Sequence, residues 1–135
     1  MEHSPELKDR MLRSYEAVSQ GDIAFMERFL SNQGDVLIIG TDPNEWWTDP
    51  ATIIELLKAQ TQAGIRVVPG DIQAYREGSV GWVADRGKFV LPDGTEVPVR
   101  LTAVFRQENG EWKLVQEHAS VGVPNQEVLG TDLNV

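Results

Sequence analysis

Residues 97–120 read VPVRLTAVFRQENGEWKLVQEHAS, and this stretch decides the fold. Two alternating runs flank Asn109-Gly110, and Asn-Gly between such runs is a strong signal for a β-hairpin because both residues accept positive φ. If these two residues form the loop, the register of the two strands follows. The pairs expected on one face are Gln107 with Trp112, Phe105 with Leu114, Ala103 with Gln116, Leu101 with His118, and Val99 with Ser120.

This face of the hairpin is the expected place for a pocket. Side chains alternate across a strand, so the polar Gln116 and His118 share the face with the apolar Leu101 and Ala103. Polar groups on a core-facing surface need partners from the protein, from water or from a ligand. We therefore expect this face to look toward the helices, while the face that carries Arg100 looks away.

Composition limits the class of protein. The chain has 135 residues, enough for one domain, and a formal net charge of −9 with no basic run, which argues against nucleic acid and anionic membranes as partners. It has no cysteine and two histidines, which excludes thiolate and His-rich metal sites, and no cofactor is predicted. Neither a signal peptide nor an apolar run of roughly 18 residues is present. We expect a cytoplasmic single domain over residues 1–135, with its core at about 7–129 and loose termini.

Three helices are expected before the strands. Ser4-Pro5 gives an N-cap followed by proline, Asp22 can cap a second helix, and Asp49-Pro50 starts a third in the same way as the first. Apolar residues at helical spacing should bury one side of each helix. They are Leu7, Met11, Tyr15 and Val18, then Phe25, Met26, Phe29 and Leu30, then Ile53, Ile54, Leu56 and Leu57.

Trp46 and Trp47 form the second informative stretch. Two adjacent tryptophans in a polar loop cannot both point the same way. In one interpretation, one closes the core and the other covers a helix end. In the other, at least one of them walls a ligand cavity, since such pockets are mostly apolar and aromatic.

A turn at residues 91–95 extends the register to a third strand. Leu91-Pro92-Asp93-Gly94-Thr95 is typical of a type I turn with a glycine bulge, and it follows a strand expected over residues 80–90. The resulting pairing puts Asp85 opposite Leu101, in one row with His118. Adjacent strands lie about 4.8 Å apart, so the Asp85 and His118 backbones would be roughly 10 Å apart, a span that suits one shared ligand.

These elements together carry a family resemblance. The stretches that carry it are Gly40-Thr41-Asp42, Glu45-Trp46-Trp47, Val83-Ala84-Asp85-Arg86, Leu91-Pro92-Asp93-Gly94, Arg100-Leu101-Thr102, Gly110-Glu111-Trp112-Lys113-Leu114-Val115 and His118-Ala119-Ser120-Val121-Gly122-Val123-Pro124. From about Leu7 to Leu129 the chain resembles the SnoaL-like branch of the nuclear-transport-factor-2-like superfamily. Its final strand also resembles the association domain of calcium/calmodulin-dependent protein kinase II, in the Gly-x-Trp start and the His-x-Ser end.

The resemblance implies an α+β fold, cone-shaped, with three N-terminal helices packed in a strongly curved, mainly antiparallel sheet. It also implies a cavity between helices and sheet, and a homodimer through the outer sheet face. The superfamily includes cyclases, isomerases, epoxide hydrolases, dehydratases and pure binding modules, so fold alone does not decide function. The kinase association domain binds carboxylates through arginines, and Ala103 occupies one of those positions here, which argues against anion binding of that kind.

Three functions follow as hypotheses. In a proton-transfer enzyme of the isomerase or cyclase type, Asp85 would be the base and His118 or Gln116 the donor. The residues expected to bind the small-molecule ligand are Tyr15, Trp46, Trp47, Val83, Leu101, Ala103 and Gln116. The second hypothesis is a non-catalytic ligand-binding or dimeric assembly module, in which Asp85 pairs with Arg86, Arg100 or a loop amide and His118 is a core histidine. In the third, the two tryptophans contact a partner.

Overall fold

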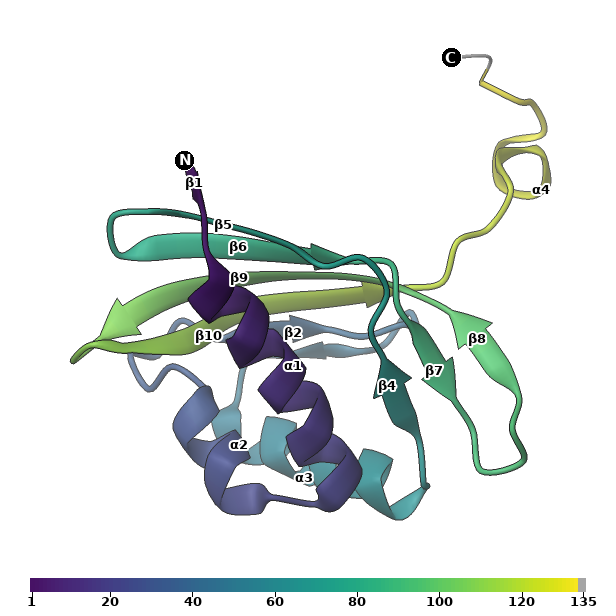
Figure 1. Ribbon diagram of the computed structural model, residues 1–135. Coiled ribbons are helices and arrows are strands. Elements are labelled where there is room, and N and C mark those ends of the chain that lie inside the picture. The colour runs from purple at the N-terminus through teal and green to yellow at the C-terminus, as the bar shows by residue number, and fades with distance from the viewer. Residues whose placement is uncertain (134–135) are drawn as a thin grey trace.

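The protein has the expected α+β architecture in a computed structural model that describes residues 1–133 (Figure 1). The helices are α1 (Pro5–Gln20), α2 (Ile23–Phe29), α3 (Pro50–Gln62) and α4 (Asn125–Leu129). The strands are β1 (Glu2–His3), β2 (Leu37–Ile39), β3 (Trp46–Trp47), β4 (Arg66–Val68), β5 (Gln73–Glu77), β6 (Val80–Asp85), β7 (Lys88–Val90), β8 (Glu96–Pro98), β9 (Arg100–Glu108) and β10 (Glu111–Ser120).

The three expected helix starts are confirmed. The Ser4 hydroxyl accepts a hydrogen bond from the Leu7 amide at 3.3 Å, Asp22 caps α2 through the Phe25 amide at 3.1 Å, and Asp49 caps α3 in the same way. Each side chain satisfies one of the amides that a helix start leaves without an intrahelical partner. Local sequence therefore fixes where the helices begin.

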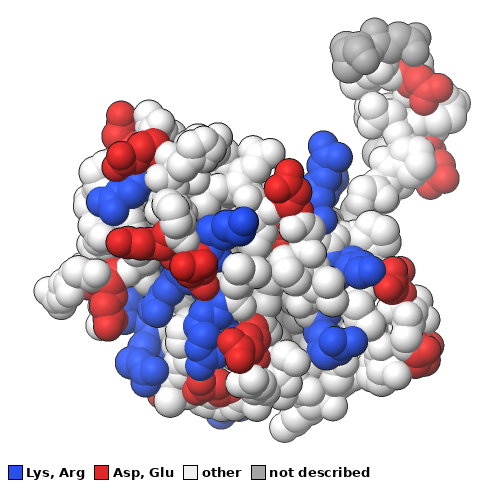
Figure 2. All heavy atoms as spheres, viewed as in Figure 1, with Lys and Arg blue, Asp and Glu red and all other residues white. Residues whose placement is uncertain are grey.

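The strands form two sheets around the helices. The large sheet has the order β1-β5-β6-β9-β10-β2-β3, with β2 parallel to β10 and the other neighbours antiparallel, and a second sheet has the order β4-β7-β8. Figure 1 shows α1, α2 and α3 under one face of the large sheet, with the small sheet turned down beside them. None of α1, α2 and α3 covers the opposite face of the large sheet. Figure 2 shows Lys and Arg interspersed with Asp and Glu on the viewed face.

The strand expected over residues 80–90 is two strands in different sheets. β6 ends at Asp85, the chain turns through Arg86-Gly87, and β7 pairs with β4 and β8. The pairings predicted on either side are confirmed, with Asp85 opposite Leu101 and β7 paired in register with β8. The corner lets one continuous stretch of sequence cover the helices from two directions.

The register predicted for the final hairpin is confirmed from the turn to Leu114 and is wrong beyond it. Leu114 pairs with Phe105, but Gln116 pairs with Val104, so Val115 is an extra residue that forms a β-bulge. From there Glu117 lies opposite Ala103 and Ala119 opposite Leu101. A shift of one residue exchanges the two faces of a strand, so Glu117 and Ala119 point inward in place of Gln116 and His118.

The bulge lies where β10 changes its neighbour. Before it, the Leu114 carbonyl accepts a hydrogen bond from the Ser31 amide at 2.9 Å, just after α2. After it, β2 pairs with β10 from Gln116 onward. The strand therefore adjusts its register at the junction between two different partners, an event that its own alternation does not encode.

The C-terminal arm, residues 121–133, leads away from the body of the protein. It includes α4 and rises on the side of the large sheet opposite the helices (Figure 1). Within residues 1–133, no helix combines the length and apolar character needed to cross a membrane.

Close packing of α1 on β6 gives a first prediction. A Cβ atom added to Gly81 would collide with Cδ1 of Leu7 and lie 2.7 Å from the Tyr75 carbonyl oxygen. Gly81→Ala should therefore lower the free energy of unfolding by about 1–3 kcal/mol, because a packed interior resists added volume. Urea denaturation would measure this. Gly122→Ala is the matched control, since its Cβ would meet nothing closer than 3.9 Å, and equal stability of the two variants would contradict the packing.

Candidate functional site

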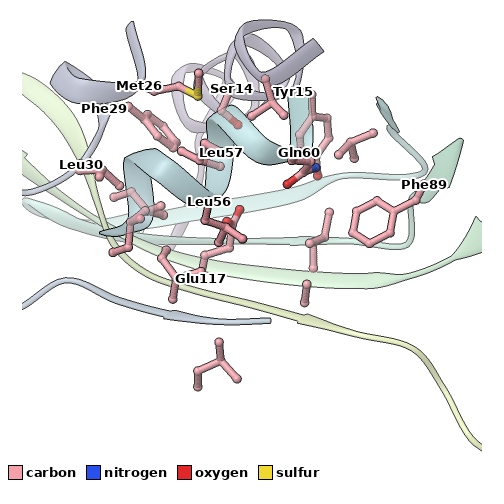
Figure 3. Close-up of a pocket in the computed structure, with 18 residues that line it drawn as sticks. Ser14, Tyr15, Met26, Phe29, Leu30, Leu56, Leu57, Gln60, Phe89 and Glu117 are labelled. Atoms are coloured by element: carbon pink, nitrogen blue, oxygen red, sulfur yellow. The ribbon is translucent and has the colours of Figure 1, made fainter. Parts of the chain in front are cut away.

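A cavity of about 100 Å³ lies between the inner face of the large sheet and α1, α2 and α3 (Figure 3). Its wall is completed by Val67 of β4 and Phe89 of β7 from the small sheet. Of the 18 residues that line it, all are apolar except Ser14, Tyr15, Gln60 and Glu117. An apolar hollow with a few convergent polar groups is the usual form of a small-molecule site.

Glu117 is the charged group of this cavity. It lies on β10 in a row of inward residues, between Ala103 on β9 and Ile38 on β2. Figure 3 shows its carboxyl reaching from the sheet toward Leu56 of α3. Burial, with no hydrogen bond from another described residue to offset it, raises the pKa of the Glu117 carboxyl to about 7. The group is therefore poised to exchange a proton near neutral pH.

Tyr15 lines the cavity, but its proton is already engaged. The Tyr15 hydroxyl donates a hydrogen bond to Oδ2 of Asp85 at 2.8 Å, and the Gly70 amide donates to Oδ1 at 2.9 Å. Burial, followed by this hydrogen bond and the nearby charge of Asp85, raises the pKa of the Tyr15 hydroxyl well above its usual value. Asp85 is itself 4% exposed. Asp85 thus joins α1 to the loop before β5, which agrees with the loop-amide interpretation of this residue.

The other two polar lining residues differ in what they offer. Ser14 donates its hydroxyl proton to the Met11 carbonyl at 2.6 Å, inside α1. Gln60 extends from α3 at one end of the cavity (Figure 3), and its amide takes part in no hydrogen bond with the other residues in the range 1–133 that line the cavity. Gln60 is therefore the lining side chain with a free N–H donor.

The structure brings only part of the predicted site together. Tyr15 and Leu101 line the cavity. Val83 and Ala103 point inward but are buried in the core beside it. Neither residue is among those that line the cavity.

Gln116 and His118 do not face the cavity, and the prediction that they do is wrong. Both are exposed on the outer face of the sheet, because the bulge at Val115 reverses the alternation of β10. The expectation of a core histidine at position 118 fails for the same reason. Glu117 and Ala119 occupy the inward positions expected of Gln116 and His118.

The two tryptophans lie outside the cavity lining. Trp47 is partly buried and packs against the hydrophobic core, while Trp46 is 64% exposed on the edge strand β3. They point to opposite sides of the sheet, as neighbours on a strand must. This agrees with the interpretation in which one of them closes the core.

Sequence reasoning missed Ser14, Gln60 and Glu117. Ser14 and Gln60 lie on the buried stripes of α1 and α3, three residues after Met11 and Leu57 respectively, so helical periodicity could have found both. Glu117 had no such signal, because its direction depends on the bulge. Within the described range 1–133, no three His, Asp or Glu side chains are grouped to hold a metal ion.

The chain belongs to the SnoaL-like domain family, whose model matches residues 7–124. This confirms the resemblance noted in the sequence. No curated protein gives a significant match to the chain.

Solved structures confirm the nuclear-transport-factor-2-like fold. An NTF2-like protein of unknown function from Pseudomonas putida superposes with a TM-score of 0.79 at 13% identity, covering 93% of this chain and 94% of that one. A protein provisionally assigned as a dehydratase from Streptomyces avermitilis gives 0.76 at 17% identity, with 87% and 95% covered. One provisionally assigned as a calcium/calmodulin-dependent protein kinase II association domain, from Xanthomonas campestris, gives 0.73 at 16% identity, with 90% and 89% covered.

The raised pKa of Glu117 predicts a pH-dependent cost to stability. The folded protein holds this proton more tightly than the unfolded chain, whose carboxyl has a pKa near 4.5. Stability is therefore unaffected below about pH 4.5, falls as the pH rises to about 7, and stays reduced above that. Glu117→Gln should remove the cost and stabilise the protein by on the order of 3 kcal/mol at pH 8.

Urea denaturation at pH 4.5 and pH 8 would measure this difference. Glu27→Gln is the matched control, since Glu27 is exposed on α2. A stabilisation by Glu117→Gln that is the same at both pH values, or that Glu27→Gln reproduces, would contradict the burial of this carboxyl.

Proposed function

We propose that the cavity binds a small, mainly apolar molecule and that Glu117 holds the one polar group of that molecule. The observation that carries this proposal is a carboxyl with no partner from a described residue, in the lining of a mainly apolar cavity. A buried polar group without a partner costs free energy, and a native protein that keeps one usually has a use for it. A ligand that bonds to Glu117 and fills the apolar space satisfies both features at once.

A second candidate is proton transfer of the isomerase or cyclase type, with Glu117 as the general base. A base works best when its pKa lies near the working pH, and burial brings Glu117 to that range. The developing oxyanion would need donors, and Gln60 is the lining group that can donate freely, since Tyr15 bonds to Asp85. Glu117 thus suits the role of a base, but among the described residues Gln60 is the single lining side chain free to donate to an oxyanion. Binding is therefore the first candidate.

Binding and proton transfer can be separated with one small ketone. Cyclopentanone should raise the melting temperature of the wild type at pH 6, where protonated Glu117 can donate to its carbonyl. Ala119→Phe should abolish the shift by filling the cavity. His118→Ala should leave it unchanged, because this imidazole faces outward.

The same ketone in D₂O reports proton transfer. Accelerated exchange of the hydrogens beside its carbonyl at pH 8, lost by about 10²-fold or more in Glu117→Gln, would establish Glu117 as a base. Binding without acceleration would favour the non-catalytic module. Two results would contradict binding in this cavity. One is a melting temperature of the wild type that cyclopentanone leaves unchanged, and the other is an equal cyclopentanone-induced shift in the Ala119→Phe variant.

We also propose that the protein forms a homodimer through the outer face of the large sheet. Half-buried Trp82 and Val104 lie in one row of this face, and Trp82 stacks on Tyr75 with ring centroids 5.0 Å apart. The C-terminal arm rises on the same side (Figure 1). Its large apolar side chains are 44–64% exposed: Val121, Val123, Val128, Leu129 and Leu133. A second copy on this face would cover the row and the arm together.

Light scattering after size exclusion would test the dimer. The wild type should show about twice the chain mass of 15.0 kDa. Val104→Glu should shift the mass to that of one chain by placing a charge in the interface, and removal of residues 123–135 should weaken the association. Thr52→Glu, at an exposed position on α3, is the control. A wild type that stays monomeric at high concentration would contradict this arrangement.

A further inference from the structure

We propose that the polar group held by Glu117 is a protonated amine, so that the cavity selects small apolar amines. This inference rests on the proposed binding function and adds the chemical class of the ligand. It follows from the charges that line the cavity and from what a bound molecule does to the water around Glu117.

The lining carries one acidic side chain and no basic one. Among its 18 residues there is no Lys, Arg or His, so an anionic ligand would meet only the charge of Glu117. Two like charges in an apolar space repel strongly because little water screens them. A carboxylate or phosphate ligand is therefore disfavoured, which extends to the whole cavity the expectation drawn from Ala103.

A neutral ligand further destabilises the ionised form of the Glu117 carboxyl. A molecule that fills the cavity removes whatever water still reaches the carboxylate, and the ionised form loses that solvation. An ammonium group replaces the lost water with an opposite charge and an N⁺–H donor, which gives a strong, charge-assisted hydrogen bond. Gln60, from α3, also lines the cavity and carries an amide oxygen, which can accept an N–H donor from a ligand.

Proton linkage distinguishes these two classes of ligand. An amine favours the ionised form of Glu117, so its binding near pH 7 releases a proton from the protein. A neutral ketone or alcohol favours the protonated form and takes a proton up. The other titratable group in the lining is Tyr15 of α1, which keeps its hydroxyl proton and donates it in a hydrogen bond to Asp85. The lining residues of α2, α3, β2, β4, β7 and β9 present uncharged side chains to the cavity.

The cavity volume sets the size of the probe. A cavity of roughly 150 Å³ admits benzene, so about 100 Å³ suits a smaller ring or a short branched chain. Cyclopentylamine, cyclopentanol and cyclopentanecarboxylate share one ring and differ in charge. An alkylamine, like a lysine side chain, is protonated at pH 7–8.

Isothermal titration calorimetry at pH 8 with these three probes tests the inference. Cyclopentylamine should bind the wild type at least tenfold more tightly than cyclopentanol, and cyclopentanecarboxylate should bind least. Glu117→Gln should weaken the binding of cyclopentylamine at least tenfold and leave the affinity for cyclopentanol unchanged or higher. Glu27→Gln, the exposed control, should alter neither.

A second titration at pH 7 in two buffers of different ionisation enthalpy should show proton release on binding of cyclopentylamine. Binding of the carboxylate as tight as that of the amine, amine binding that survives Glu117→Gln, or proton uptake with the amine would overturn the inference. If cyclopentanone stabilises the wild type at pH 6 while cyclopentylamine fails to bind at pH 8, the cavity is a binding site and only the amine assignment is wrong. If no probe binds, both proposals fall.

Discussion

The extra residue at Val115 sets the direction of every side chain that follows it on β10. Without the bulge, Gln116 and His118 would face the helices and the cavity would hold an imidazole and an amide. With it, the cavity holds one carboxyl, at Glu117, and the small side chain of Ala119, which leaves room beside Leu101. A single backbone irregularity thus decides both the charge and the volume of the candidate site.

The cavity persists because the elements around it are tied together outside it. Asp85 accepts hydrogen bonds from Tyr15 on α1 and from the Gly70 amide, at the corner where the chain leaves the large sheet for the small one. The caps of α1, α2 and α3 fix the helix starts, and the Ser31 amide joins the end of α2 to β10. These contacts hold the helices against the two sheets, and the apolar space that remains between them costs packing energy.

Glu117 and Asp85 show how position separates two carboxyl groups of one protein. Asp85 is buried with both oxygens hydrogen-bonded, so its charge is satisfied by the protein itself. Glu117 is partly buried in the cavity lining without such partners from residues 1–133, and its desolvation there lifts its pKa toward neutrality. The hydrogen bonds of Asp85 support the fold, whereas the desolvation of Glu117 costs free energy that a bound molecule can offset.

Much of this architecture follows from local sequence. The caps at Ser4, Asp22 and Asp49, the Asn109-Gly110 turn with both residues at positive φ, and the order of helices before strands act over a few residues, so they are legible in the chain. The family resemblance rests on the same local features. The tertiary structure alone decided the composition of the cavity, because the bulge at Val115 forms where β10 passes from the end of α2 to β2, two segments more than 75 residues away in sequence. The alternation of side chains along one strand does not determine which segments pair with it. The inward position of Glu117 therefore became clear only from the tertiary structure.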